Sequence, residues 1–351
     1  MLEETDNKYM RRCIDLAVKA EGYTFPNPVV GAVVVFRDSV IGEGYHLQAG
    51  KPHAEVVAIN SVKNRELLKL STLYVSLEPC CHYGKTPPCT DLIISSGIPR
   101  IVAGTIDTSS KVSGKGIEIL KGAGREVTVG IMEKECRWVN RKFFTFHEKK
   151  RPYITLKWAE SADGFIDTER EASSTPEPYW ITGMAERVLV HKWRASEETI
   201  LVGGETVRKD NPKLNVRYWS GRDPLKVILS RSGNICKYLT ENETKSKIFT
   251  FTGNRNFSSG NTEIFYLEEE ANAGKTICDV LYNNGIQSLM VEGGAMVLNH
   301  FISAGLWDEA RIFKGYENFH KGVRAPFIEG EEIFRTEFET SSLRIIINKN
   351  R

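Results

Sequence analysis

Residues 53–80 read HAEVVAINSVKNRELLKLSTLYVSLEPC, and this stretch decides the fold of the first half of the chain. A helix should begin near His53, because apolar side chains recur with helical spacing from Val56 to Ile59. The run TLYVSL at 72–77 is rich in β-branched and apolar residues and predicts a strand. A helix followed by a buried strand is typical of an α/β domain.

The same alternation continues on both sides of this stretch. Upstream, the runs VVGAVVVF (29–36) and VIGEGY (40–45) predict a hairpin, preceded by a helix at 8–20. Downstream, we expect further elements in alternation: a helix from about Cys89, a strand at 100–106, a helix at 116–124 and a strand at 126–131. Strands alternating with helices predict an α/β layer sandwich.

A charged segment, HEKKRP at 147–152, ends in proline and separates two regions that each begin the alternation anew. We therefore expect two domains, residues 1–147 and 148–351, each large enough to bury its own core. In the second, strands are predicted at 153–159, 199–204, 225–230, 247–252, 263–267 and 288–294, and helices at 183–195, 275–284 and 295–304. The tail after Glu329 carries no clear pattern.

The composition of the chain narrows the class of protein. Of 351 residues, 41% are hydrophobic and 26% charged, which is typical of a globular protein and argues against a disordered chain or a coiled-coil rod. The net charge of +2 is too small to attract nucleic acid or an anionic membrane through long-range electrostatics. Acidic residues stand where a signal peptide needs basic ones, and no apolar run approaches the roughly 18 residues of a membrane span. We expect a cytoplasmic protein.

His53-Ala54-Glu55 opens the predicted helix, Pro79-Cys80 follows the predicted strand, and a further cysteine stands at Cys89. These are the two halves of the zinc deaminase signature. One histidine and two cysteines give three zinc ligands and leave a fourth position to water, whose pKa the metal lowers toward about 7. Glu55 is then free to carry protons between that water and a leaving amine.

Neighbouring residues compete for the role of ligand. Cys81 and His82 lie beside Cys80, but adjacent residues at the end of a strand point to opposite sides, which favours Cys80. The alternative to a metal site is a surface histidine with buried cysteines, and the combination of HAE, EPC and Cys89 argues against it. Four cysteines have no ligand spacing and are interpreted as core residues: Cys13, Cys136, Cys236 and Cys278.

Glycine pairs are the main local signal in the second region. No G-x-G-x-x-G motif follows a strand there, so the sequence lacks the glycine-rich turn with which a Rossmann domain binds a dinucleotide. Gly203-Gly204 and Gly293-Gly294 each follow a predicted strand and allow a ligand to approach the backbone closely. The second pair precedes a helix, whose N-terminus is a favourable place for a phosphate. Taken alone, each pair also fits an ordinary turn.

The string Leu77-Glu-Pro-Cys-Cys-His-Tyr-Gly-Lys-Thr-Pro-Pro-Cys89 closely resembles the riboflavin-biosynthesis bifunctional deaminase/reductase family. Further matching blocks lie at 26–31, 44–46, 112–116, 180–182, 206–212 and 291–294, so the resemblance runs from Asn27 to about Pro326. It implies a cytidine-deaminase-like three-layer α/β/α domain followed by a dihydrofolate-reductase-like α/β domain that uses NADPH.

In the first domain, the resemblance implies zinc ligands at His53, Cys80 and Cys89, with Glu55 as the proton shuttle. It implies that five residues hold the pyrimidine and its ribose phosphate: Asn27, His46, Lys85, Asp107 and Ser109. Lys85 lies between two of the ligands in the sequence, so its ammonium can reach a phosphate beside the metal. The chain departs from the family at Ser109, where a hydroxyl replaces the usual amide.

In the second domain, the resemblance implies a cofactor side formed by Ala159, Trp180, Thr206, Asp210 and Gly294. The implied substrate side comprises Arg194, Leu214, Arg217 and Glu292. Lys157 and Asp210 are the groups expected to handle protons, and the Arg217 guanidinium suits a phosphate because it can bind one bidentately. Pro178 stands where the family often has a serine, in a lengthened loop.

The resemblance predicts two reactions on a small-molecule substrate. The first is the zinc-dependent hydrolytic deamination of 2,5-diamino-6-(5-phosphoribosylamino)pyrimidin-4(3H)-one. The second is the NADPH-dependent reduction of the ribosyl chain of 5-amino-6-(5-phosphoribosylamino)uracil. One alternative is a tRNA adenosine deaminase with an accessory domain, although such enzymes use a short C-x-x-C, whereas eight residues separate Cys80 from Cys89 here. Another is a deaminase with a lapsed reductase domain. The sequence leaves open whether the chain forms a homo-oligomer.

Overall fold

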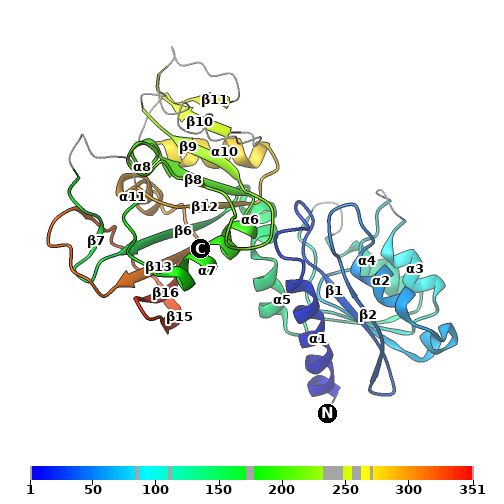
Figure 1. The fold of residues 1–351 in the computed structure, drawn as a ribbon. Helices are drawn as coiled ribbons and strands as arrows, with labels where there is room; N and C mark the ends of the chain where they lie inside the picture. The colour runs from blue at the N-terminus through cyan, green and yellow to red at the C-terminus, as the bar shows by residue number, and fades with distance from the viewer. Residues whose placement is uncertain are drawn as a thin grey trace. The chain divides into compact units, whose positions relative to one another are not determined.

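A computed structural model of the chain describes residues 2–83, 87–109, 113–170, 178–231, 248–254, 262–268 and 272–349. The chain divides into two compact units, residues 1–150 and 151–351, which are seen in Figure 1 in blue to cyan-green and in green to red. The segment that we expected to separate the domains at 147/148 is partly helical, because helix α6 (Arg141–Lys149) continues to Lys149. The chain leaves this helix at Lys150, which adopts a left-handed conformation with φ 56°.

The described residues of the first unit form a five-stranded sheet with the order β2-β1-β3-β4-β5. The predicted hairpin is present as β1 (Gly31–Phe36) and β2 (Ser39–Tyr45), which pair antiparallel. The strand β3 (Thr72–Val75) pairs antiparallel with β1, and β4 (Arg100–Ala103) and β5 (Glu126–Val129) then continue the sheet parallel to β3. Parallel neighbours require crossover helices, which the alternating sequence supplies.

Helices cover both faces of this sheet, as the period of two along β1 requires. Ala32 and Val34 pack on one side with α2 (Ala54–Ser61), α3 (Cys89–Ser95) and α4 (Lys115–Gly122). Val33 and Val35 pack on the other side with α1 (Leu2–Val18) and α5 (Glu133–Val139). The predicted three-layer α/β/α arrangement is confirmed, while a 3-10 helix η1 (Arg65–Leu70) and the helices α5 and α6 were not predicted.

The second unit contains a nine-stranded sheet among its described residues, with the order β11-β10-β9-β8-β12-β6-β13-β16-β15. Six of its strands were predicted: β6 (Tyr153–Glu160), β8 (Thr199–Gly203), β9 (Leu225–Leu229), β10 (Ile248–Thr252), β11 (Thr262–Tyr266) and β12 (Ser288–Val291). The other three were not: β13 (Glu309–Gly315), β15 (Glu331–Glu337) and β16 (Ser341–Ile347). A separate ribbon pairs β7 (Phe165–Asp167) with β14 (Val323–Arg324).

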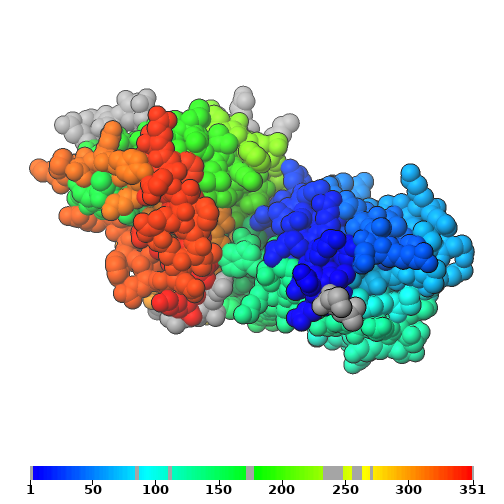
Figure 2. Space-filling view, turned by 90° about the horizontal axis from the view of Figure 1, so that it is seen from below, coloured from blue at the N-terminus to red at the C-terminus, as the bar shows by residue number. Residues whose placement is uncertain are grey.

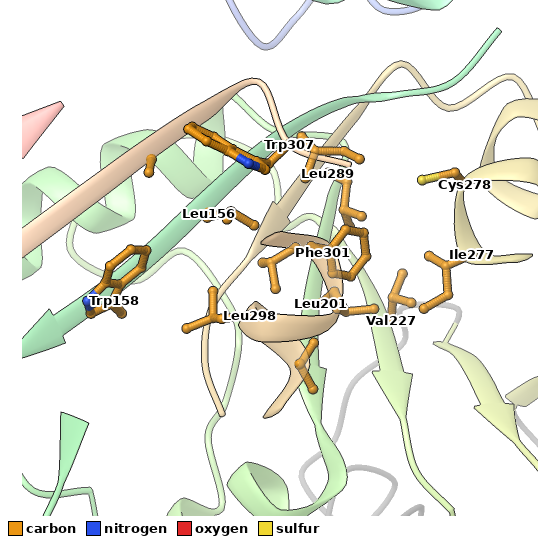
Figure 3. Packing of buried hydrophobic residues seen from close by; sticks show 14 of the residues in the cluster. Leu156, Trp158, Leu201, Val227, Ile277, Cys278, Leu289, Leu298, Phe301 and Trp307 are labelled. Carbon is orange, nitrogen blue, oxygen red and sulfur yellow. The ribbon is translucent and has the colours of Figure 1, made fainter. Parts of the chain in front are cut away.

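Helices also cover this larger sheet. On one face, α10 (Ala273–Asn283) and α11 (Ala295–Ser303) enclose a core around Leu156, Leu201 and Phe301, drawn in Figure 3. On the other face, α8 (Gly204–Asp210) packs against Ile200 and Val202, and α7 (Met184–Ala195) contributes a second cluster near Phe313. The edge strand β15 is mostly exposed, and the orange and red end of the chain lies on the face turned to the viewer in Figure 2.

Among the described residues, no helix combines the length and the apolar character needed to cross a membrane. Cys13, Cys136 and Cys278 are buried, as predicted, whereas Cys236 lies outside the described residues.

Candidate active sites

The three predicted metal ligands converge in the first unit. His53 is the N-cap residue of α2, Cys80 follows β3, and Cys89 is the first residue of α3. His53 Nδ1 lies 3.4 Å from Cys80 Sγ and 3.4 Å from Cys89 Sγ. The three ligand atoms lie within 4.8 Å of one another, and Cys81 and His82 do not belong to this cluster. One imidazole and two thiols in this arrangement fit a zinc ion that keeps an open position.

The backbone around the cluster favours a thiolate. Cys80 Sγ accepts the backbone N–H of Cys89, at 3.4 Å, at the start of α3. The hydrogen bond with the Cys89 thiol, together with the contact to His53, lowers the pKa of Cys80 to about 4 against the opposing effect of burial. The hydrogen bond with Cys80 and burial raise the pKa of Cys89. A lowered pKa at Cys80 suits a zinc ligand, because zinc binds the thiolate form of cysteine, and a bound cation would favour the deprotonation of Cys89 as well.

Glu55 lies in the first turn of α2, two residues from His53, and is buried. Burial raises the pKa of Glu55 to about 7, and the nearby Cys80 charge acts in the same direction. A carboxyl group with a pKa near neutrality can both accept and donate a proton at working pH. The geometry therefore fits the role of a proton carrier beside the three ligands.

His46 and Asn27 form a second polar group beside the cluster. The Pro52 carbonyl oxygen lies 3.1 Å from His46 Nδ1 and can only accept, so this nitrogen carries the proton. His46 Nε2 then accepts from the Asn27 amide at 3.1 Å. The His46 ring lies edge-on to the ring of His53, with centroids 5.3 Å apart. Both residues were predicted on the substrate side, and the structure brings them next to the predicted metal ligands.

Asp107 and Ser109 lie in the loop after β4. The Asp107 carboxylate is buried and accepts the backbone N–H of Ser109 at 2.7 Å. This short-range hydrogen bond is typical of an Asx turn and fixes the shape of the loop. The predicted phosphate contact at Lys85 lies outside the described residues.

Glu78 is a buried acidic residue that sequence analysis did not single out. Its Oε2 accepts the backbone N–H groups of Asp107 at 3.1 Å and Gly114 at 2.9 Å. Its Oε1 accepts those of Gly116 at 2.9 Å and Ile117 at 3.3 Å. One carboxylate thus binds both the loop that carries Asp107 and the first turn of α4, where negative charge is also favoured by the helix dipole. The only sequence signal is its position next to Pro79-Cys80.

The second unit contains a cavity of about 420 Å³. Its walls include every residue predicted for the reductase site except Leu214, namely Lys157, Ala159, Trp180, Arg194, Thr206, Asp210, Arg217, Glu292 and Gly294. The Leu214 side chain is buried in the core with Ile200 and Val207, so it does not line this cavity. A ligand contact at Leu214 would require its backbone. Pro178, the departure from the family pattern, also lines the cavity.

The glycine pair after β12 shapes one wall of this cavity. Gly293 and Gly294 adopt φ values of 121° and 76°, which residues other than glycine rarely adopt. A Cβ on Gly294 would meet Thr206 Oγ1 at 3.2 Å. Helix α11 begins at the next residue, and the orphan N–H groups of its first turn favour an anion. These features fit the diphosphate of a nucleotide cofactor.

Charged side chains also line this cavity. Arg194 and Glu292 form a bidentate ion pair, with both nitrogen–oxygen distances at 2.7 Å. Although burial raises the pKa of Glu292, Arg194 lowers it to about 2. Burial lowers the pKa of Lys157, while Glu292 opposes this effect. Lys157 therefore lies within the field of an anion already paired with an arginine, a setting that suits an amine that must give up a proton.

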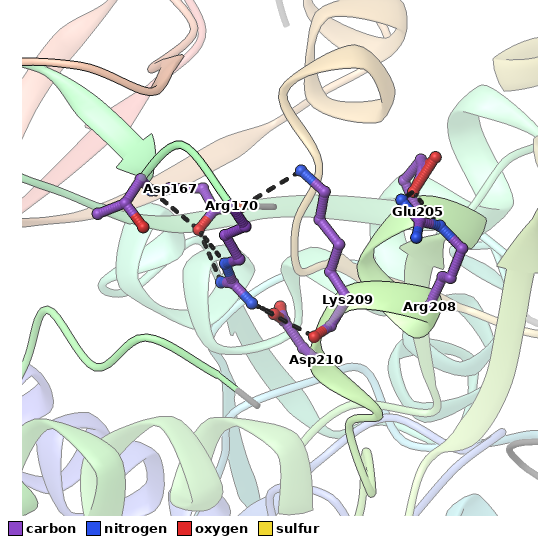
Figure 4. Close-up of polar contacts among 7 residues, drawn as sticks. Asp167, Arg170, Glu205, Arg208, Lys209 and Asp210 are labelled. Carbon is purple, nitrogen blue, oxygen red and sulfur yellow. Dashed lines mark hydrogen bonds and ion pairs between the residues drawn. The ribbon is translucent and has the colours of Figure 1, made fainter. Parts of the chain in front are cut away.

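Arg170 is a further residue that sequence analysis missed, and Figure 4 shows its contacts. Its guanidinium donates to Asp167 Oδ1 at 2.6 Å and to Asp210 Oδ1 at 2.8 Å. Lys209 Nζ lies 3.6 Å from Asp167 Oδ2 on the same side. The Asp210 carboxylate is thus bound by a guanidinium, and both residues line the cavity. The lengthened loop gave no pattern that would have identified Arg170.

Family models match both halves of the chain. The cytidine and deoxycytidylate deaminase zinc-binding region matches residues 3–105, and the RibD C-terminal domain matches residues 152–315. The riboflavin biosynthesis protein RibD of Aquifex aeolicus is 42% identical over 320 residues, covering 89% of this chain and 87% of that protein. The chain belongs to the RibD family. RibD of Bacillus amyloliquefaciens is 40% identical over 314 residues, covering 87% of this chain and 83% of the relative.

Solved structures of RibD proteins agree with this family membership. The diaminohydroxyphosphoribosylaminopyrimidine deaminase/5-amino-6-(5-phosphoribosylamino)uracil reductase of Thermotoga maritima matches with a TM-score of 0.88 at 35% identity, over 99% of this chain and 100% of that one. RibD of Acinetobacter baumannii matches with a TM-score of 0.84 at 30% identity, over 98% of this chain and 99% of that one.

This member of the RibD family is a bifunctional enzyme of riboflavin biosynthesis, with a zinc-dependent deaminase domain followed by a reductase domain. The predicted fold class, the small-molecule chemistry and the predicted cofactors, zinc and NADPH, are confirmed at that level. Because its relatives match over both halves, the alternative of a tRNA deaminase with an unrelated accessory domain is set aside.

Proposed function

We propose that each activity resides in its own unit and is carried by the residues that the sequence singled out. In the first unit, His53, Cys80 and Cys89 would hold the zinc ion, and Glu55 would move the proton. The observation that supports this most strongly is the approach of the three ligand atoms to within 4.8 Å of one another, beside a buried carboxyl group.

Zinc bound there supplies a water of lowered pKa, and the protein residues do the rest. Glu55 would accept a proton as the water oxygen adds to the ring carbon that carries the amine, and would donate a proton to the amine as the carbon–nitrogen bond breaks, so that ammonia departs and a carbonyl remains. Asn27 and His46 orient the pyrimidine through their linked amide and imidazole. Lys85, Asp107 and Ser109 complete the substrate side in this proposal. A hydroxyl at Ser109 supplies one donor where an amide would supply two.

In the second unit, the cavity would hold the nicotinamide cofactor against Ala159, Trp180 and Thr206, with its diphosphate at the Gly294 turn. Bound NADPH supplies a hydride, which must reach the ribosyl C1 carbon from about 3 to 3.5 Å. Arg217 would bind the substrate phosphate, because its side chain is exposed at the cavity and its guanidinium matches phosphate geometry.

The reduction also needs a proton for the opened sugar oxygen. We assign this proton to the Lys157 ammonium, which lines the cavity beside Glu292. Asp210 would contact the cofactor side and is held in place by Arg170. The Arg194–Glu292 pair would contact the substrate and keep Lys157 in position. Leu214 would contribute through its backbone. A charged cavity of this kind argues against a lapsed reductase.

A cytoplasmic location is part of the proposal, because two cysteine ligands must stay reduced in order to bind zinc.

The proposal is tested by product analysis of the purified chain with the diaminopyrimidine substrate. Without NADPH, we expect ammonia and 5-amino-6-(5-phosphoribosylamino)uracil. With NADPH, we expect the ribitylamino compound and one equivalent of oxidised cofactor. In His53→Ala, both products should be missing when the diaminopyrimidine is supplied, while the uracil substrate should still be reduced. Reduction lost together with deamination in a folded His53→Ala protein would contradict the assignment of separate sites.

A further inference from the structure

His191 is a histidine of the reductase cavity to which sequence analysis gave no role. It lies on α7, is 3% exposed and lines the cavity together with Lys157, Arg194 and Glu292. Its Nδ1 lies 3.0 Å from the backbone nitrogen of Arg217. A backbone N–H can only donate, so Nδ1 must accept. The proton of the neutral ring is therefore on Nε2.

The surroundings keep this ring neutral. A proton on Nδ1 would face the Arg217 N–H directly and would cost that hydrogen bond. Burial lowers the pKa of His191 to about 4, and the cations Arg194, Arg217 and Lys157 act in the same direction. Glu292 opposes them, but its carboxylate is already bound by Arg194. Near neutral pH, His191 is thus a fixed donor rather than a cation.

The Nε2–H group has no acceptor among the described residues. The ring is held at Nδ1 by the Arg217 backbone and packs edge-on against Tyr218, with ring centroids 4.8 Å apart. These two contacts restrict its rotation and leave the opposite edge, which carries Nε2, for the cavity. His191 lines the cavity, so a donor that has no partner in the described part of the chain is available there to an acceptor on a bound ligand. The arrangement is that of a site prepared for a ligand oxygen.

We propose that the Nε2–H of His191 donates a hydrogen bond to an uncharged oxygen, a pyrimidine carbonyl or a sugar hydroxyl, of the ribosylaminopyrimidine bound for reduction. This inference rests on the proposed reductase function of the cavity. An uncharged oxygen fits better than the phosphate, because the cationic side chains nearby, including Arg217, bind a phosphate more strongly than a neutral imidazole does. His191 would then contribute to the recognition of the base or sugar.

Two substitutions separate this role from a purely structural one. In His191→Asn, the amide oxygen occupies roughly the place of Nδ1 and can keep the Arg217 contact, but no donor reaches the place of Nε2. In His191→Gln, the amide nitrogen reaches roughly the place of Nε2, but the Arg217 contact is lost. His300→Asn, on the last turn of α11 and outside the cavity lining, is the matched control.

The measurements are the kcat/KM for 5-amino-6-(5-phosphoribosylamino)uracil, the KM for NADPH and the thermal midpoint of unfolding. We expect His191→Asn to lose about 10- to 100-fold in kcat/KM for the uracil substrate, the range of one lost hydrogen bond to a buried partner. Its KM for NADPH and its ammonia release should be unchanged. His191→Gln should retain more of the reductase activity, and the control should match the wild type.

Wild-type reduction by His191→Asn would overturn the inference, and so would equal losses in the Asn and Gln variants. Either result would mean that a hydrogen bond from Nε2 does not contribute to the reduction of the substrate. A wild-type chain that fails to oxidise NADPH with this substrate would instead refute the proposed function of the cavity, and the inference with it.

Discussion

Glu78→Gln is the substitution that best tests how the deaminase site is built. Glutamine has nearly the same shape as glutamate, but only one of its two terminal atoms can accept hydrogen bonds. In either orientation, two of the four backbone N–H groups that contact Glu78 would face an NH₂ group instead of an oxygen. The perturbation is therefore confined to the loop after β4 and the first turn of α4.

The magnitude follows from the number of donors left without an acceptor. Each buried, unsatisfied donor costs about 1–3 kcal/mol, so two of them should weaken the local structure by about 2–6 kcal/mol. Because about 1.4 kcal/mol corresponds to a factor of ten in an equilibrium constant, exchange of the Gly114, Gly116 and Ile117 amides should accelerate at least about 20-fold. Hydrogen exchange followed by mass spectrometry measures the exchange of the backbone amides in this segment. Ammonia release should fall with it, since Asp107 lies in the same loop.

Glu126→Gln is the matched control in the same unit. The Glu126 side chain is 70% exposed and pairs with Arg100 at 3.2 Å. Such exposed pairs contribute about 0–1 kcal/mol, so exchange at 114–117 should stay at the wild-type rate. Unchanged exchange of these amides in a folded Glu78→Gln protein would refute the argument that this carboxylate holds the loop and the helix together.

Further predictions concern both sites. Glu55→Gln should keep one zinc ion per chain by metal analysis and lower ammonia release by about 10²–10⁴-fold; near-normal release would remove Glu55 from the mechanism. Lys157→Met should stop NADPH oxidation in a spectrophotometric assay while ammonia release continues, and loss of both activities in zinc-loaded protein would contradict separate sites. Although burial raises the pKa of Glu292, Arg194 lowers it to about 2, below the ordinary value of 4.5. The ion pair therefore stabilises the fold above pH 4.5 and is lost as the pH falls toward 2. The difference in unfolding free energy between wild type and Glu292→Gln should shrink over that range, and a difference independent of pH would argue against it.

The elements that the sequence predicted correctly are those whose burial follows a simple period. The strand at 72–77 is a short apolar run that is buried on both faces of the sheet, and the helix that begins beside His53 buries Ala54, Ala58 and Ile59 at helical spacing. The strand β13 shows the opposite case. Its sequence, EARIFKG, looks polar, yet Glu309 and Arg311 are buried and pair with each other at 2.6 Å. Because the two charges are paired, both residues can be buried, and a strand with buried charges does not show the apolar periodicity by which strands are predicted.

The same distinction explains which site residues were found. The metal ligands lie at short spacings next to element ends, so their chemistry can be inferred from local sequence. Glu78 and Arg170 act through backbone or carboxylate groups that are far away in the sequence, and the His191 ring is oriented by such a group, the backbone of Arg217. Such partners become visible only when the fold brings the segments together. Residues that hold a site in place are thus harder to predict than residues that carry out its chemistry, because what defines them is the contact and not the residue type.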